Sequence, residues 1–150
     1  MRTNLKEKVA LVTGASSGLG ERFARVLAAN GALVVLAARR LERLKELRAQ
    51  IEAAGGAAHA VALDVTDQDA IAAAIDEVGA SVGPIDILVN NSGVSTQQRL
   101  TEVAPTDFDY VFGTNVRGAF FVAQAVARQM IARAKETPNF SGRIVNIASV

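Results

Sequence analysis

The sequence of 150 residues contains no cysteine, no tryptophan, one tyrosine and one histidine. The absence of cysteine excludes disulfides, thiolate metal ligands and a cysteine nucleophile. His59 has no second histidine or cysteine with which to bind a metal, so we interpret it as structural and expect no metal site. The net charge of +1, from 16 basic and 15 acidic residues, implies no basic face, so nucleic acid is not an expected partner.

Long apolar runs are also missing from the chain. No stretch approaches the roughly 18 residues that a helix needs to cross a bilayer. The segment Met1–Lys8 is polar and charged, unlike a secretory signal. We therefore expect a soluble cytoplasmic protein without a membrane span. Its length suits one domain, residues 1–150, and its many Ala, Val, Leu and Ile residues are typical of parallel strands covered by helices on both faces.

The most informative stretch is the glycine-rich segment Thr13–Gly20, whose glycines follow the spacing G-x-x-x-G-x-G. An apolar run over 9–12 precedes it, and a helical pattern over 21–29 follows. A strand, a tight turn and a helix opening offer backbone N–H groups and a helix N-terminus to an anion, so a dinucleotide pyrophosphate is the predicted guest. A plain tight turn remains an open alternative.

Strand and helix patterns alternate along the whole chain with short connections. The expected strands cover 8–13, 32–38, 57–65, 85–90 and 143–149, and the expected helices cover 18–30, 39–54, 67–82 and 106–135. Thr66 with Asp69 resembles a capping box at the start of the third helix. Right-handed strand–helix–strand crossovers then predict an α/β fold, a Rossmann-like doubly wound parallel sheet with strand order 3-2-1-4-5.

The end of the second strand predicts which dinucleotide binds. This position faces the adenosine ribose, where an acidic residue would bond a free 2′-hydroxyl and arginine accommodates a 2′-phosphate. Here the residues are Arg39 and Arg40, so we expect NADP(H), with Arg39 on the phosphate and a hydroxyl from Ser17 beside it. The alternative is that both arginines only begin a charged helix.

Polar residues also follow the third and fourth strands. Asp64 could accept a hydrogen bond from the adenine amino group, or it could simply assist the turn before Thr66. The run Asn90-Asn91-Ser92-Gly93 could cross-link neighbouring strand ends and let a ligand approach at the glycine, or it could be a plain asparagine turn.

Taken together, these motifs resemble the short-chain dehydrogenase/reductase family over essentially the whole chain. The matching segments are Thr13–Gly20, Asp64-Val65, Asn90–Gly93, Asn115 and Arg143–Ser149. Two positions depart from the family pattern: Ser92 stands where alanine is usual, and Ala148 stands where serine is common.

The resemblance implies a set of cofactor-binding residues in the turn and at the strand ends: Gly14, Ser16, Ser17, Gly18, Leu19, Gly20, Arg39, Asp64, Val65, Asn91, Ser92 and Gly93. It also implies that Ser149 polarises the substrate carbonyl and that Asn115 holds a water in a proton relay. A structural polar link at Asn115 and an ordinary strand-end serine at Ser149 remain open alternatives. We interpret Tyr110 as a packing or surface residue, because it precedes Ser149 in the sequence and lies near the start of the long expected helix.

The activity that the resemblance implies is hydride transfer between NADP(H) and a carbonyl or secondary alcohol, with the 3-oxoacyl thioester reductases as the nearest subgroup. The family's Y-x-x-x-K motif, expected about thirteen residues after Ser149, does not occur in the sequence, so we expect the chain to lack the C-terminal part of the family fold. A non-catalytic dinucleotide-binding or regulatory protein is the alternative. An epimerase or dehydratase of the extended branch is disfavoured because that branch spaces its glycines G-x-x-G-x-x-G.

The expected helix over 106–135 carries apolar residues on more than one face, whereas a helix on a sheet needs a stripe of only about 100°. We expect this surplus to form a homodimer or homotetramer interface, as the resemblance implies. Cover from a missing C-terminal half is the alternative.

Overall fold

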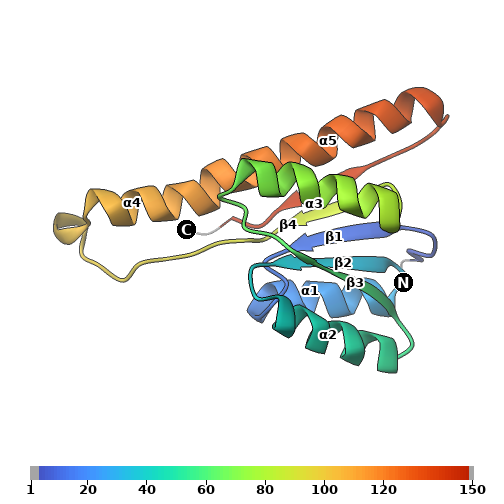
Figure 1. Cartoon of the computed structure of the whole chain (residues 1–150), viewed down its shortest axis with the longest axis horizontal. Helices are drawn as coiled ribbons and strands as arrows, with labels where there is room; N and C mark the ends of the chain where they lie inside the picture. The colour runs from blue at the N-terminus through green and yellow to red at the C-terminus, as the bar shows by residue number, and fades with distance from the viewer. Residues whose placement is uncertain (1–3, 149–150) are drawn as a thin grey trace.

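The computed structural model describes residues 4–148, and within that range five parallel strands form one sheet (Figure 1). The strands are β1 (Val9–Thr13), β2 (Leu33–Ala38), β3 (Ala57–Ala62), β4 (Ile87–Asn90) and β5 (Arg143–Asn146). Their order is β3-β2-β1-β4-β5, and every neighbouring pair is parallel, which confirms the predicted topology.

Helices cover both faces of this sheet. The main helices are α1 (Gly18–Ala29), α2 (Leu41–Ala53), α3 (Gln68–Ser81), α4 (Pro105–Phe112) and α5 (Ala119–Glu136). In Figure 1, α1 and α2 lie on one face, while α3 and α5 lie on the other. The described helices do not include one that is both long enough and apolar enough to cross a membrane.

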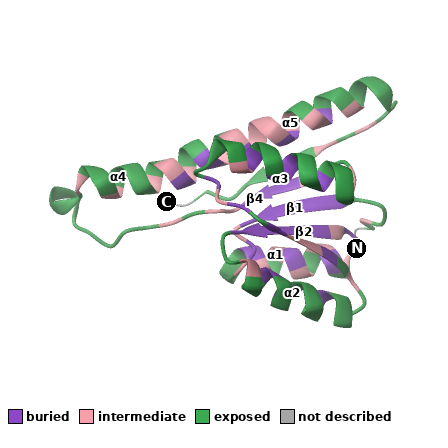
Figure 2. Cartoon of the chain, viewed as in Figure 1, coloured by how far each residue is buried: buried purple, intermediate pink, exposed green. Residues whose placement is uncertain are grey.

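The side chains of β1 alternate between two hydrophobic cores, as a strand with a period of two requires. Val9 and Leu11 pack with residues of α3 and α5, whereas Ala10 and Val12 pack with residues of α1 and α2. All five residues of β1 are buried, and Figure 2 shows the central strands as the buried layer between exposed helix surfaces. Burial on both faces explains why β1 is an unbroken apolar run.

Two predictions for the region after β3 differ from the structure. The strand ends at Ala62 instead of Val65, and the predicted capping box at Thr66 is wrong. Asp67 caps α3 instead, since its carboxylate accepts hydrogen bonds from the N–H groups of Asp69 and Ala70. The Thr66 hydroxyl instead donates to the carboxylate of Asp64 at 2.7 Å.

The long helix predicted over 106–135 is divided into three parts. Between α4 and α5 lies η2 (Gly113–Gly118), a π-helical segment in which the backbone bonds reach one residue further. A short 3₁₀ turn, η1 (Leu100–Glu102), precedes α4. No residue of α4 is buried, and Figure 1 shows this helix extending beyond the sheet.

The last described strand, β5, ends at Asn146 rather than at Ser149, and all four of its residues are exposed. Ser149 itself lies outside the described residues. Within residues 4–148, β5 is an edge strand paired with β4 alone.

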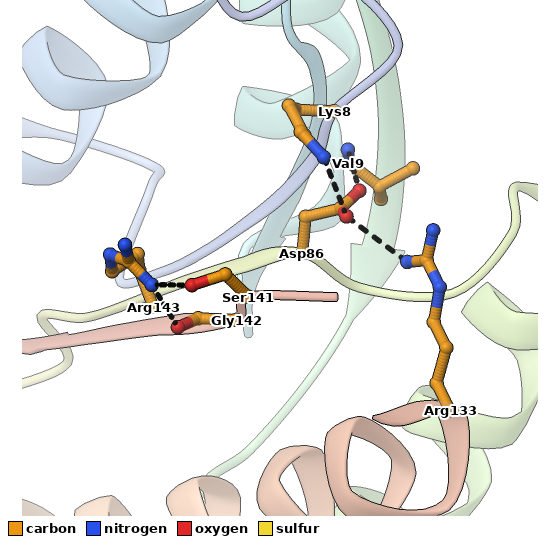
Figure 3. Close-up of polar contacts among 7 residues, drawn as sticks. All are labelled: Lys8, Val9, Asp86, Arg133, Ser141, Gly142 and Arg143. Atoms are coloured by element: carbon orange, nitrogen blue, oxygen red, sulfur yellow. Dashed lines mark hydrogen bonds and ion pairs between the residues drawn. The ribbon is translucent and has the colours of Figure 1, made fainter. Parts of the chain in front are cut away.

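A buried carboxylate joins the sheet to α5 at the end opposite the glycine-rich turn (Figure 3). Asp86 accepts a hydrogen bond from the N–H of Val9 at 2.9 Å and pairs with Lys8 at 3.4 Å and Arg133 at 3.0 Å. Its side chain is 3% exposed, whereas those of Lys8 and Arg133 remain partly in water. The Arg133 guanidinium also stacks on Phe140, 4.5 Å from the ring centroid. A buried charge is tolerated here because it is paired and hydrogen-bonded.

Replacing Asp86 with alanine should destabilise the fold strongly. The variant leaves the buried N–H of Val9 without an acceptor and removes both ion pairs. We expect the free energy of unfolding to fall by about 3 kcal/mol, measured by denaturant titration.

Glu42→Ala is the matched control, because Glu42 pairs with Lys45 at 2.7 Å on the solvent side of α2, with both side chains more than half exposed. It should change the free energy of unfolding by less than about 1 kcal/mol. Equal losses in the two variants would contradict the structural importance of Asp86.

Candidate functional site

The glycine-rich turn connects β1 to α1 at the carboxyl end of the sheet. Gly14 and Gly18 have φ of +66° and +59°, which glycine adopts without a steric penalty. A Cβ at Gly20 would clash with the carbonyl oxygen of Gly14, so only glycine allows the first turn of α1 to approach the start of the glycine-rich turn this closely. Ser17 precedes α1 without a side-chain capping bond, which leaves N–H groups of the first turn open to an anion.

Side chains join the turn to the segment after β4. The Thr13 hydroxyl, which is fully buried, accepts hydrogen bonds from the N–H groups of Asn91 at 2.9 Å and Ser92 at 3.0 Å. In return, the Asn91 amide donates to the carbonyl of Thr13 at 3.1 Å. These three bonds fix the two strand ends side by side at the point where the chain order in the sheet reverses, which is where doubly wound folds bind ligands.

A cleft of about 260 Å³ opens at this edge of the sheet. Its lining comes from the glycine-rich turn, the ends of β2 and β3, the segment after β4 and one residue of η2: Gly14, Ser16, Ser17, Ala38, Arg39, Arg40, Leu63, Asp64, Val65, Asn91, Ser92, Gly93, Val94 and Thr114. Nine of the twelve predicted cofactor-binding residues are among them. The other three, Gly18, Leu19 and Gly20, lie at the start of α1 and are not part of the lining.

Two arginines line the cleft in different settings. Arg40 donates to the hydroxyls of Ser16 at 3.0 Å and Ser17 at 2.9 Å, which brings its guanidinium over the glycine-rich turn. Arg39 is close enough to Asp64 to interact with it electrostatically. The sequence predicted a phosphate contact for Arg39 and gave Arg40 no role beyond the start of a helix. Its contact with serines more than twenty residues away is tertiary and has no local signal.

Asp64 also lines the cleft. Its carboxylate accepts hydrogen bonds from the N–H of Thr66 at 2.9 Å and from its hydroxyl at 2.7 Å. The pKa of Asp64 lies below its usual value chiefly because its carboxylate accepts the backbone bond from Thr66. Burial is the next largest effect and opposes this, while the Thr66 hydroxyl and the positive charge of Arg39 lower the pKa further. Asp64 is therefore ionised at neutral pH and can act only as an acceptor.

The asparagines hold backbone segments. Asn115, in η2, pairs with both backbone groups of Val94: its Oδ1 accepts from the N–H and its Nδ2 donates to the carbonyl, each at 2.8 Å. Asn90 donates to the carbonyl of Ala119 at 2.6 Å and to the side chain of Asn146 at 3.2 Å. The segment after β4 is thus attached to the helix above it as well as to β1.

Two buried threonines, the tyrosine and the histidine remain to be placed. Thr13 and Thr114 are buried at the site, and neither was assigned a role from the sequence. Tyr110 lies on α4, 45% exposed and outside the cleft lining. His59 lies on β3 with its Nε2 3.7 Å from Glu77 on α3. Residues 4–148 contain no cluster of His, Asp and Glu suited to a metal ion.

Comparison with known proteins identifies the family. The model of the family described as short chain dehydrogenase matches residues 8–150. The chain belongs to the short-chain dehydrogenase family. The chain is 46% identical over 141 residues to a gluconate 5-dehydrogenase of Gluconobacter oxydans, covering 94% of this chain and 53% of that protein. It is 41% identical over 145 residues to a galactitol 2-dehydrogenase of Agrobacterium fabrum, covering 97% and 54%.

Solved structures agree with this short-chain dehydrogenase assignment. The crystal structure of a gluconate 5-dehydrogenase from Burkholderia cenocepacia, in complex with NADP and tartrate, superposes with a TM-score of 0.89 at 41% identity. It covers 99% of this chain and is itself covered over 56% of its length. The chain thus spans about half the length of the relatives it matches.

Proposed function

We propose that the protein is an NADP(H)-dependent oxidoreductase that interconverts a secondary alcohol and a ketone. The observation that carries this proposal is the pair of guanidiniums, Arg39 and Arg40, at the end of β2 beside the open glycine-rich turn. No carboxylate follows β2 where a ribose 2′-hydroxyl would need one. The Burkholderia cenocepacia relative, whose crystal structure is a complex with NADP, supports the same cofactor.

The cleft fits a dinucleotide phosphate in charge and shape. Gly14 and Gly20 keep the turn free of side chains where a pyrophosphate would approach, and the N-terminus of α1 favours negative charge there. Two arginines favour a 2′-phosphate, and the ionised Asp64 offers an acceptor to an adenine amino group. Asn91, Ser92 and Gly93 line the remaining side, where we place the ribose and the nicotinamide half.

We propose a catalytic role for Ser149, three residues after β5 in the sequence, and a positioning role for Asn115 of η2. NADP(H), when bound, supplies or accepts the hydride. Ser149 would donate a hydrogen bond to the oxygen that gains charge as a ketone is reduced. Asn115 uses its amide to hold Val94, so we assign it the positioning of the backbone beside the reaction site. The two relatives, a gluconate and a galactitol dehydrogenase, favour a polyhydroxylated substrate, a sugar acid or a polyol, over a 3-oxoacyl thioester.

The activity is tested by following NADPH absorbance with a panel of keto sugar acids, ketoses and 3-oxoacyl thioesters. We expect turnover with a polyhydroxylated ketone. Ser149→Ala should lower that turnover about 100-fold or more while the affinity for NADPH is kept, because the lost hydrogen bond forms mainly in the transition state. Normal turnover in the alanine variant would overturn the role of the serine. NADPH binding without turnover on any ketone would favour a regulatory dinucleotide-binding protein.

Cofactor choice is tested by Arg39→Asp. The variant removes a phosphate partner and adds a carboxylate that can bond the 2′-hydroxyl of NAD. The ratio of kcat/KM for NADPH over NADH should fall about 10- to 100-fold, the worth of one or two charge-assisted bonds. Arg43→Asp is the matched control, because Arg43 pairs with Glu46 on the exposed side of α2 and is not part of the cleft lining. An unchanged ratio in Arg39→Asp, or the same change in Arg43→Asp, would rule out the assignment.

We also propose that the outer face of α4 and α5 pairs with a second copy of the chain. Phe108, Phe112, Val116 and Phe120 recur every four residues across α4, η2 and α5, and each is about half exposed or more. The rings of Phe108 and Phe112 stack with centroids 4.1 Å apart. An apolar stripe of this length on the surface is typical of a protein–protein interface.

Phe120→Glu should break this assembly, because it places a charge at the α5 end of the apolar stripe. Light scattering coupled to size-exclusion chromatography should show a dimer or tetramer for the unaltered protein and a smaller species for the variant. Lys135→Glu, which also introduces a glutamate but near the far end of α5, should leave the mass unchanged. An unaltered protein that is already monomeric would contradict the proposed interface.

A further inference from the structure

The backbone of η2 touches the wall of the cleft formed by the segment after β3. Gly118 is the last residue of η2 and is buried. A Cβ at this position would lie 2.6 Å from the carbonyl oxygen of Val65 and 2.9 Å from its Cγ2. Val65 is itself 7% exposed and lines the cleft beside Asp64. The two backbones can therefore meet only because residue 118 has no side chain.

The same short segment is attached to the other wall. Asn115, three residues before Gly118, holds both backbone groups of Val94, and the next residue after η2, Ala119, accepts the amide of Asn90. Thr114 contributes directly to the lining. One turn of π-helix thus contacts two segments that enter the cleft from different strands.

We propose that Gly118 is a positioning residue for the adenine end of the cleft. Its missing side chain lets η2 lie directly against Val65, and this contact fixes Asp64 and Val65 at a set distance from the segment after β4. The inference rests on the proposed function, because it takes a nucleotide as the ligand of the cleft. Any side chain at residue 118 forces either the helix or Val65 to move, since backbone atoms cannot rotate away as a flexible side chain can.

A displacement of Val65 should alter ligand binding at one end of the cleft and not at the other. Val65 and Asp64 lie on the side of the cleft that we assign to adenine, so a shift there changes the fit of that base and leaves the glycine-rich turn in place. A misplacement of about 1 Å is enough to cost a large factor in binding or rate. The effect should therefore fall on the adenosine half of a dinucleotide.

The test compares Gly118→Ala with Gly113→Ala in the purified protein. Gly113 begins the same π-helix, and a Cβ there meets nothing within 4 Å, so it is a matched control. Dissociation constants are measured by calorimetry for two probes, AMP and nicotinamide mononucleotide. In Gly118→Ala we expect AMP binding to weaken about tenfold or more, with nicotinamide mononucleotide binding changed less than about twofold. Gly113→Ala should keep both constants within about twofold.

Unchanged AMP binding in Gly118→Ala, or an equal loss for both probes, would overturn the inference, because the second result is general disruption of the site. If the unaltered protein binds neither AMP nor NADPH, the proposed function fails instead.

A measurement on the unaltered protein covers the case in which Gly118→Ala does not fold. Hydrogen exchange is followed with and without AMP. If Gly118 carries the contact, AMP should slow exchange at 63–66 and also across 113–119. Protection at 63–66 with none at 113–119 would contradict the contact as a positioning device.

Discussion

The arrangement of the cleft depends on the buried hydroxyl of Thr13, which binds two successive backbone N–H groups after β4. Parallel strands expose their carboxyl ends at one edge of the sheet, and at this point the connections leave in opposite directions. The chain must still keep the two loops at a fixed separation there. Thr13 and Asn91 do so with three partly buried hydrogen bonds. The glycine-rich turn can consequently lack side chains at Gly14 and Gly20 and still be held in place.

The π-helical segment η2 likewise holds two backbone segments at a fixed separation on the other side of the cleft. A continuous α-helix from α4 into α5 would not present the same residues to the sheet, because one extra residue per turn rotates everything that follows. With η2 in place, Asn115 faces Val94 and Gly118 faces Val65 within one turn. The helix that covers the sheet therefore also determines the shape of the ligand site, and its outer apolar stripe remains available to a partner.

The topology could be predicted from sequence because each strand and helix carries its own periodic pattern, and right-handed crossovers then leave few arrangements. Most of the cleft lining was also predictable, since the motifs come directly at strand ends. The cap of α3 escaped for a local reason: Thr66 and Asp67 are both good capping residues, and it is the carboxylate of Asp67 that accepts from the first turn. The other features that escaped are tertiary. The bonds of Arg40 to the serines and the burial of Asp86 depend on residues distant in sequence.

The bond between the N–H of Val9 and Asp86 also bears on how the chain folds, because its partners are 77 residues apart. β1, β2 and β3 pair in sequence order across short βαβ units, whereas β4 must return past all of them to reach the free side of β1. Closing so long a loop carries a larger entropic penalty than closing either βαβ unit. We therefore expect the half of the sheet with α1 and α2 to assemble before the second half joins it. In that order of events, the bonds of Asp86 would form late and connect two parts of the fold that are built at different times.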